Sequence, residues 1–299
     1  MLQEKVLKIF RVDNRKKFKL ADHKPGWNQA PEFEDFGKDA VKARAQEVLQ
    51  QNLADLAEAQ EVLAADGRFS VLIVLQAMDA AGKDGTIKHV MSGVNPQGCQ
   101  VFSFKKPSSE DLAHNFLWRY MKSLPERGRI GIFNRSYYED VLVTKVHPEL
   151  LSRGVTNGKK PGKKFWDKRY EDINAFERHL VRNGTLILKF FLNVSKDEQK
   201  ERFMERLSRE EKHWKFSTSD LAERGHWDEY MGAYQDAIAA TSTKWAPWYV
   251  VPADYKWITR AVVADVVTTG IRGLKCQYPA VTPEQHALLE EARKKLGEE

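Results

Sequence analysis

One stretch of the chain, VLIVLQAMDAAGKDGT at residues 71–86, constrains the fold more than any other. It begins with a short run of β-branched and leucine residues, which predicts a buried strand. The run breaks into small residues and then into Gly82 and Lys83, where we expect a helix to begin. A backbone of small residues can wrap an anion so that successive N–H groups point at it, and the helix N-terminus adds partial positive charge. The stretch therefore predicts a strand, an anion-binding loop and a helix in succession.

The loop differs at two positions from the usual P-loop pattern, G-x-x-x-x-G-K-[ST]. Ala77 stands at the first glycine, and Asp84 stands where a hydroxyl would meet Mg²⁺. Asp79 adds a second carboxylate inside the loop, and Mg²⁺ prefers oxygen ligands of this kind. With Lys83 as a mobile full charge, this set predicts a phosphate site bridged by magnesium. The alternative is an ordinary strand-to-helix turn with a surface lysine.

Strands alternate with helices across residues 70–275, which predicts an α/β fold with a doubly wound parallel sheet of about five strands and helices on both faces. Such sheets bind their ligands at the carboxyl ends of the strands. The predicted strands are 71–75, 99–104, 128–133, 185–193 and 249–252.

Apolar residues at helical spacing predict the helices between these strands. A capping box at Ser108 is expected to open a helix that carries Leu112, Phe116 and Tyr120 on one face, and Ser195 with Glu198 is expected to cap another. The other predicted helices are 39–65, which Asp66 and Gly67 terminate, 86–91, 166–180 and 257–274.

Three parts of the chain differ in composition. Residues 1–36 show no clear period and predict an irregular arm that lies on the domain. Residues 37–278 are expected to form the catalytic domain, and 279–299 a charged tail of helical composition. Within the domain, residues from about 202 to 228 are dense in cations and aromatic side chains and are expected to form a helical lid. The alternative for this segment is a charged, exposed helix pair.

The charge and cysteine content exclude several classes. The net charge of +6 is modest, but residues 152–170 hold seven Lys or Arg against one Asp, which predicts a basic patch or else a solvated charge run. Cys99 and Cys276 are the only cysteines and form no C-x-x-C, so neither a disulfide framework nor a thiolate metal site is expected. No apolar run has the length of a membrane span or a signal peptide. We therefore expect a cytoplasmic protein with no membrane partner.

A second polar cluster follows the third predicted strand. Arg135 can grip two phosphate oxygens, and Glu139 and Asp140 follow it closely. Asn134 occupies the place of the usual Walker B aspartate, and an amide is a poorer magnesium ligand than a carboxylate. The ends of the first and third strands can be neighbours in a doubly wound sheet, so this cluster is expected to meet the phosphate loop. Its alternative is a surface ion-pair cluster.

Four motifs in this order resemble the polyphosphate kinase 2 family: AMDAAGKDG at 77–85, FNRSYYEDVLV at 133–143, KHWKFSTSDLAER at 212–224 and APWYVVPAD at 246–254. The similarity runs from about residue 38 to about residue 278. It implies a P-loop kinase fold with a helical lid. It also implies Mg²⁺-dependent transfer of a phosphoryl group between inorganic polyphosphate and a nucleoside mono- or diphosphate.

The resemblance also implies roles for individual residues. Its Walker A role falls on Asp79, Lys83 and Asp84, its Walker B-like role on Asn134, Arg135, Glu139 and Asp140, and its lid on 209–224. The motifs GKDG and FNRSYYED are similar to the class III branch, which handles AMP as well as ADP. Glu139 stands where the ADP-preferring branch tends to have Asn, which makes AMP an expected acceptor.

We therefore predict a polyphosphate-dependent nucleotide kinase that uses ADP, AMP or both and forms a dimer or tetramer. Asp79, Lys83, Arg135 and Asp140 are the predicted catalytic residues, and Asp79, Asp84 and Asp140 the predicted Mg²⁺ ligands. The predicted phosphate- and nucleotide-binding residues are Ala80, Ala81, Gly82, Lys83, Asp84, Gly85, Asn134, Arg135, Glu139, Arg209, Lys212, Lys215 and Arg224.

Two alternatives stay open at this point. One is an ATP-dependent nucleoside or nucleotide kinase of the same fold, because the residues point to phosphate chemistry without fixing the donor. The other is a non-catalytic binder of polyanions such as RNA, although no nucleic-acid module is visible and no nucleic-acid partner is expected.

Overall fold

A computed structural model describes residues 4–298 except 14, 30, 152–155, 157, 158 and 160. Its centre is a five-stranded sheet in which every neighbouring pair is parallel and the strand order is β2-β3-β1-β4-β5. The strands are β1 (Ser70–Gln76), β2 (Cys99–Ser103), β3 (Ile130–Asn134), β4 (Thr185–Asn193) and β5 (Trp248–Pro252). The predicted α/β class and all five predicted strands are confirmed, with ends that differ by up to two residues.

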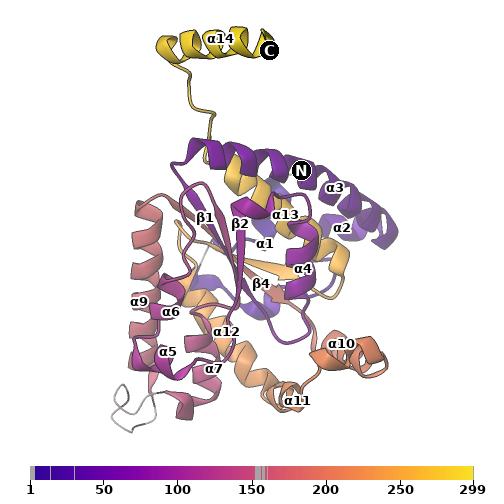
Figure 1. Cartoon of the computed structure of the whole chain (residues 1–299). Helices are drawn as coiled ribbons and strands as arrows, with labels where there is room; N and C mark the ends of the chain where they lie inside the picture. The colour runs from indigo at the N-terminus through magenta and orange to yellow at the C-terminus, as the bar shows by residue number, and fades with distance from the viewer. Residues whose placement is uncertain are drawn as a thin grey trace.

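Helices cover both faces of the sheet (Figure 1). One face carries α3 (Lys38–Asp66), α4 (Lys83–Val90) and α13 (Lys256–Arg272), with α3 and α13 packed together. The other face carries α7 (Glu139–Val146), α9 (Lys163–Arg182) and α12 (Trp227–Thr241). Because both faces are covered, all seven residues of β1 are buried, as is typical of a central parallel strand.

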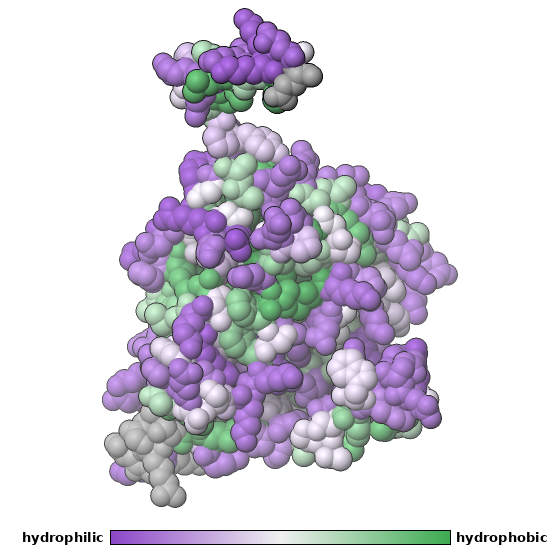
Figure 2. Space-filling view, in the orientation of Figure 1, coloured by the Kyte–Doolittle hydropathy of each residue, from purple (hydrophilic) through white to green (hydrophobic). Residues whose placement is uncertain are grey.

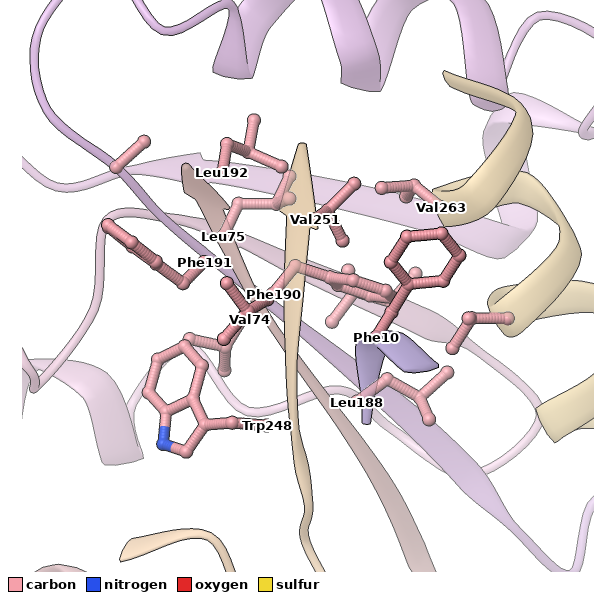
Figure 3. Close-up of a cluster of buried hydrophobic side chains, with 14 of the residues drawn as sticks. Phe10, Val74, Leu75, Leu188, Phe190, Phe191, Leu192, Trp248, Val251 and Val263 are labelled. Atoms are coloured by element: carbon pink, nitrogen blue, oxygen red, sulfur yellow. The ribbon is translucent and has the colours of Figure 1, made fainter. Parts of the chain in front are cut away.

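The core lies between these layers and includes the N-terminal segment (Figure 3). Phe10 from the first helix packs with strand residues such as Phe190 and with Val263 from α13. Burying an apolar side chain of this size contributes about 1.5–3 kcal/mol relative to leaving it exposed. The N-terminal segment therefore helps to stabilise the core around the sheet.

The N-terminal arm is more regular than predicted. It contains α1 (Glu4–Phe10), α2 (Pro31–Phe36) and two 3₁₀ turns, η1 (Arg15–Lys17) and η2 (Leu20–Asp22). The Val12 N–H donates to the Trp248 carbonyl at 2.9 Å, which ties the arm to the edge strand β5. The arm thus contacts the sheet, and it contains short helices where the sequence analysis expected an irregular segment. Its helices are too short for the apolar period to be visible in sequence.

The long helix predicted at 39–65 is confirmed as α3. The residue that follows its last turn explains why the sequence indicated where the helix ends. Gly67 adopts φ 64°, and its N–H donates to the Leu63 carbonyl. Glycine takes this left-handed conformation without the steric cost that a side chain would add.

The helix predicted to carry Leu112 and Tyr120 on one face does not form as one unit. It is divided into α5 (Ser109–Ala113), which has the predicted capping box at Ser108, and α6 (Trp118–Met121). Between them, the Asn115 side chain accepts a hydrogen bond from the Leu117 N–H at 3.0 Å. Local side-chain bonds of this kind compete with helix formation. As a result Leu112 is 65% exposed, whereas Tyr120 is fully buried.

The lid and the C-terminal tail project from opposite ends of the molecule (Figure 1). The segment predicted as a lid, from about residue 202 to 228, falls mainly in α10 (Lys196–Leu207), the 3₁₀ turn η5 (Glu210–Lys215) and α11 (Thr218–Gly225), and we keep the name lid for these three elements. The predicted tail contains α14 (Pro283–Gly297). Two further 3₁₀ turns are η3 (Pro96–Gly98) and η4 (Pro148–Leu150). Most of the predicted basic loop, 152–164, lies outside the described residues. Among those described, no helix combines the length and apolar character that a membrane span requires.

Candidate active site

The phosphate loop connects β1 to α4 as the sequence predicted. Gln76 ends the strand and Lys83 begins the helix, and the turn between them contains two residues with positive φ: Ala80 at 60° and Gly82 at 103°. At Gly82 this conformation favours a residue without a side chain. At Ala80 it costs free energy that the surrounding contacts must offset. The loop therefore has a tightly turned backbone conformation, which its surrounding contacts must maintain.

Lys83 lies inside that loop and is only 9% exposed. Its Nζ donates to the Ala77 carbonyl at 2.8 Å and the Met78 carbonyl at 3.3 Å. Burial and, to a smaller extent, the nearby Arg135 guanidinium lower the pKa of Lys83 to about 8, although the carboxylates around the loop act in the opposite direction. An arriving phosphate would favour the charged form, so the ammonium is poised to bind an anion.

Arg135 approaches the loop from the end of β3. Its Nη2 is 2.8 Å from Asp79 Oδ1, and its Nη1 is 3.9 Å from Glu139 Oε2. Arg135 has φ 64°, and its N–H donates to the Leu75 carbonyl at 3.0 Å, so the turn after β3 is fastened to the end of β1. The two strands are direct neighbours. The predicted meeting of the first and third strand ends, with Lys83 and Arg135 on the same side, is therefore confirmed.

Asp84 and Asn134 form a second contact between the same two strand ends. Asn134 Nδ2 donates to Asp84 Oδ1 at 2.7 Å. Asn134 Oδ1 is buried and accepts no hydrogen bond from any described residue. A buried oxygen without a partner beside the Asp84 carboxylate, with the Asp79 carboxylate also near Lys83, is a donor set of the kind that suits a hard cation such as Mg²⁺. The residues present thus fit the predicted metal at Asp79 and Asp84.

Asp140 points to a different set of partners. It accepts a hydrogen bond from the Tyr120 hydroxyl at 3.3 Å, and its charged neighbours are Arg119, Arg169 and Glu139. Burial raises the pKa of Asp140 to about 6. In the part of the chain that the structure describes, no three His, Cys, Asp or Glu side chains are grouped to hold a metal. The structure thus brings Asp79, Lys83, Asp84 and Arg135 together and does not show Asp140 sharing a cation with them.

Comparison with known proteins identifies the family. The family model of polyphosphate kinase 2 (PPK2) matches residues 39–278. The chain belongs to the polyphosphate kinase 2 family. Across 256 residues it is 52% identical to an ADP-polyphosphate phosphotransferase of Rhodopseudomonas palustris, covering 85% of this chain and 89% of the relative. It is 46% identical to an AMP/ADP-polyphosphate phosphotransferase of Meiothermus ruber, covering 91% and 96%.

A solved structure of the same family shares the fold. The crystal structure of polyphosphate kinase 2 from Arthrobacter aurescens TC1 matches with a TM-score of 0.83 and 40% identity, covering 95% of this chain and 96% of that one. The fold and the family that the four motifs implied are thus both confirmed.

The predicted lid cations are paired within the lid of this polyphosphate kinase 2. Arg209 Nη2 lies 2.5 Å from Glu211 Oε1 and also contacts Glu205, which binds Lys212 as well. Lys215 lies over the ring of Trp214, which is 78% exposed. Among the described residues, no contact joins these lid side chains to the phosphate loop. Their predicted role in binding phosphate stays a prediction.

Arg224 is connected to the phosphate loop through one intermediary. Its Nη1 donates to the Gln199 side-chain oxygen at 2.9 Å and to the Lys196 carbonyl at 2.7 Å. Gln199 Nε2 in turn donates to the Asp79 carbonyl at 3.0 Å. The lid is thus bonded to the loop backbone at one of the predicted metal ligands.

Arg202 is a site residue whose role the sequence analysis missed. It belongs to the cation-dense lid segment, but it is 6% exposed and points at the loop. Nη1 donates to the Ala80 carbonyl at 3.0 Å, and Nη2 donates to the Ala253 and Asp254 carbonyls at 2.6 and 3.1 Å. Arg202 thereby fixes the loop at the residue with positive φ. Gln199 and Phe203 are also buried, so this side of α10 faces inward in the structure, although composition alone does not separate Arg202 from the other lid cations.

The lid also brings an acid to the site that sequence reasoning did not single out. Asp220 on α11 lies close enough to Asp79 and Arg135 to feel both charges. Burial, followed by the Asp79 carboxylate, raises the pKa of Asp220. Opposite it, Tyr234 of α12 is buried beside Glu139 and Arg135. Charged or polar side chains of the loop, the β3 end, α11 and α12 therefore lie close enough to interact electrostatically.

Proposed function

We propose that this chain transfers a phosphoryl group between inorganic polyphosphate and ADP or AMP, giving ATP or ADP. The observation that carries this proposal is the convergence of Lys83 and Arg135 with Asp79 at the adjoining ends of β1 and β3. Phosphoryl transfer requires positioned oxygens and neutralised charge more than covalent help from the protein. This site supplies both, and the names of the relatives support the donor and the acceptors.

The chain's own residues account for the main steps. Lys83 and the loop N–H groups hold the transferring phosphoryl group, while Arg135 steadies its oxygens. A terminal phosphate oxygen of the acceptor forms a bond to the end phosphorus of polyphosphate as the bond to the next bridging oxygen breaks. That oxygen keeps the electron pair, and the polymer leaves one phosphate shorter. Closure of the lid excludes water that would otherwise take the place of the acceptor.

We propose that Asp79, Asp84 and the Asn134 side-chain oxygen hold Mg²⁺. When bound there, Mg²⁺ would neutralise charge on the phosphate oxygens. In this arrangement Asp79 has two tasks, because its side chain also pairs with Arg135. Asp140 contributes from the adjacent helix by orienting Tyr120 and Arg119.

We propose Glu139 as the residue that selects the acceptor, as in the class III branch. Its carboxylate accepts a hydrogen bond from the Gln76 side chain at 2.9 Å and faces Arg135. Gln76 is fully buried, so Glu139 is held in place rather than free to rotate. The range of the family match, 39–278, supports a catalytic domain at 37–278.

The experiment is a direct assay of the purified chain with polyphosphate, Mg²⁺ and either AMP or ADP, with products separated by chromatography. Formation of ADP from AMP and ATP from ADP, lost in Lys83→Ala, is the expected result. No product above that of Lys83→Ala would overturn the proposal. Activity with ATP and a nucleoside but not with polyphosphate would select an ATP-dependent kinase. RNA binding that survives Lys83→Ala, without turnover of any donor, would select a polyanion binder.

A further inference from the structure

The C-terminal helix α14 is exposed along its whole length. Figure 1 shows it beyond the amino end of the sheet, joined to the domain by an extended linker. Leu288, Leu289 and Leu296 are 65%, 57% and 70% exposed. They recur with Ala292 at helical spacing, so they form one apolar stripe. Figure 2 shows hydrophobic residues gathered on one side of this helix and hydrophilic residues on the other.

The sequence of α14 carries strong signals for the start of a helix. Thr282 and Gln285 form a complete capping box, and proline occupies the first helical position. Yet a single helix of 15 residues is only marginally stable in water without a surface to pack against. The stripe therefore requires a partner.

The body of the same chain offers no such surface near the linker. The Gln277 N–H donates to Asp66 at the end of α3, so only residues 278–282 are free to extend, by about 17 Å at most. The surface there is charged: Arg272 pairs with Asp55 and Glu58. Among the described residues of α3 and α13, no large apolar side chain is exposed.

The exposed apolar side chains farther away are out of reach. Phe36 precedes the opposite end of α3, which is about 43 Å long. The lid residues Met204, Leu207 and Trp214 lie beyond the carboxyl end of the sheet, opposite α14 (Figure 1). The stripe is therefore uncovered by the rest of the described chain in this structure.

The charges of α14 identify the partner. Its first nine residues carry Glu284, Glu290 and Glu291 and no Lys or Arg, whereas its last turns carry Arg293, Lys294 and Lys295. Two copies side by side in antiparallel orientation place each acidic half against a basic half while their leucines meet. Parallel orientation would place like charges together, which is unfavourable.

We propose that α14 is a self-association element that pairs in antiparallel fashion with α14 of a second copy of this chain. The family match ends at residue 278, so this element lies outside the part that defines the family. The pair is small compared with stable interfaces, which bury about 1,200 Å² or more, so association is reversible and concentration-dependent. Because α14 lies opposite the lid, both catalytic edges stay open in the pair.

The test uses the full chain in sedimentation velocity over a concentration series. Leu289→Glu places a charge in the stripe, whereas Ala287→Glu adds the same charge to the opposite side of the helix. We expect Leu289→Glu to remove one doubling of the mass at high concentration and Ala287→Glu to keep it, with phosphotransfer per chain unchanged in both. Equal masses for the wild type and Leu289→Glu would overturn the proposal.

Charge reversal tests the orientation and the identity of the partner. One variant carries Glu284→Lys, Glu290→Lys and Glu291→Lys, and the other carries Arg293→Glu, Lys294→Glu and Lys295→Glu. Each alone should lose the doubling because its helix has one sign of charge, and an equimolar mixture should regain it. A mixture that stays dissociated would show that α14 does not pair with itself, and the proposal would be wrong.

Discussion

Two buried lysines of this kinase, one on strand β4 and one at the start of helix α4, have opposite kinds of partner. Lys189 on β4 is fully buried, and its Nζ lies 2.6 Å from Glu177 Oε2 and 2.9 Å from the Tyr138 hydroxyl. Lys83 has only backbone carbonyls as direct partners. The protein neutralises the first charge internally and leaves the second to be neutralised by a ligand. Because both lysines are buried, we predict the catalytic one from its partners: it is Lys83, which has no bonded carboxylate among the described residues.

The largest effect is expected from substituting Lys189, the lysine that is paired with a buried carboxylate. Lys189→Met would leave the Glu177 carboxylate buried without a cation, so we expect the free energy of unfolding to fall by about 3–5 kcal/mol in urea titration. The double variant Lys189→Met with Glu177→Gln removes the stranded charge and should recover most of the loss. A loss below about 1 kcal/mol in the single variant would contradict the assignment of Lys189 to stability.

At Lys83 we expect the reverse result. Lys83→Met should lower kcat/KM by about 10²–10³-fold, the scale for one preorganised group that stabilises the transferred charge. The free energy of unfolding should change by less than about 1 kcal/mol, because removing a desolvated charge offsets the loss of its two hydrogen bonds to the loop. Urea titration and initial rates on the same preparation measure both quantities. A large loss of stability with retained rate would reverse the roles of the two lysines.

Arg202 is a third buried cation near the loop, and each of its three guanidinium nitrogens donates a hydrogen bond inside the protein. Arg202→Lys keeps the charge but cannot bond Ala80, Ala253 and Asp254 together. We expect kcat to fall by roughly 10–100-fold as the loop loses its position, with a smaller change in KM for polyphosphate. Lys200→Gln, on the exposed side of the same helix, is the matched control. Equal effects of the two substitutions would indicate a general charge effect.

The smallest expected effect is a pH dependence. The pKa of Lys83 is lowered from 10.5 to about 8, so its charge is lost as the pH rises through 8. Between pH 7 and 9 we expect kcat/KM to fall about tenfold, and Lys83→Arg should lack this decline because guanidinium stays charged. For stability the sign is opposite. The unfolded lysine binds more protons between pH 8 and 10.5, so the contribution of this group to stability rises with pH there. A flat rate profile in the wild type would contradict the lowered pKa.

Much of the fold could be predicted because its signals are local. The strand from Ser70 to Gln76 and the loop to Lys83 are contiguous, and the end of α3 carries its own glycine at Gly67. The meeting of Lys83 with Arg135 followed from the rule that parallel strand ends share an edge. These inferences required no knowledge of side-chain direction.

What could not be predicted depends on direction and on distant partners. Asp140 and Glu139 are adjacent in sequence, but one step along the first turn of α7 points them to different neighbours. Arg202 was indistinguishable by composition from the lid cations around it, because only packing shows that it turns inward. The broken helix at Asn115 depends on one side-chain hydrogen bond that no apolar pattern encodes.

The carboxylates that the lid keeps beside its own cations affect which molecules it can hold. Glu205 already occupies Arg209 and Lys212, and Glu211 occupies the other side of Arg209. A ligand that binds these cations must first displace them. A lone phosphate gains little from that exchange, whereas a long chain of phosphates makes it at several positions for a single loss of translational freedom. We therefore predict that the lid favours extended polymers over short ones, and that its acids contribute to this selectivity as much as its bases.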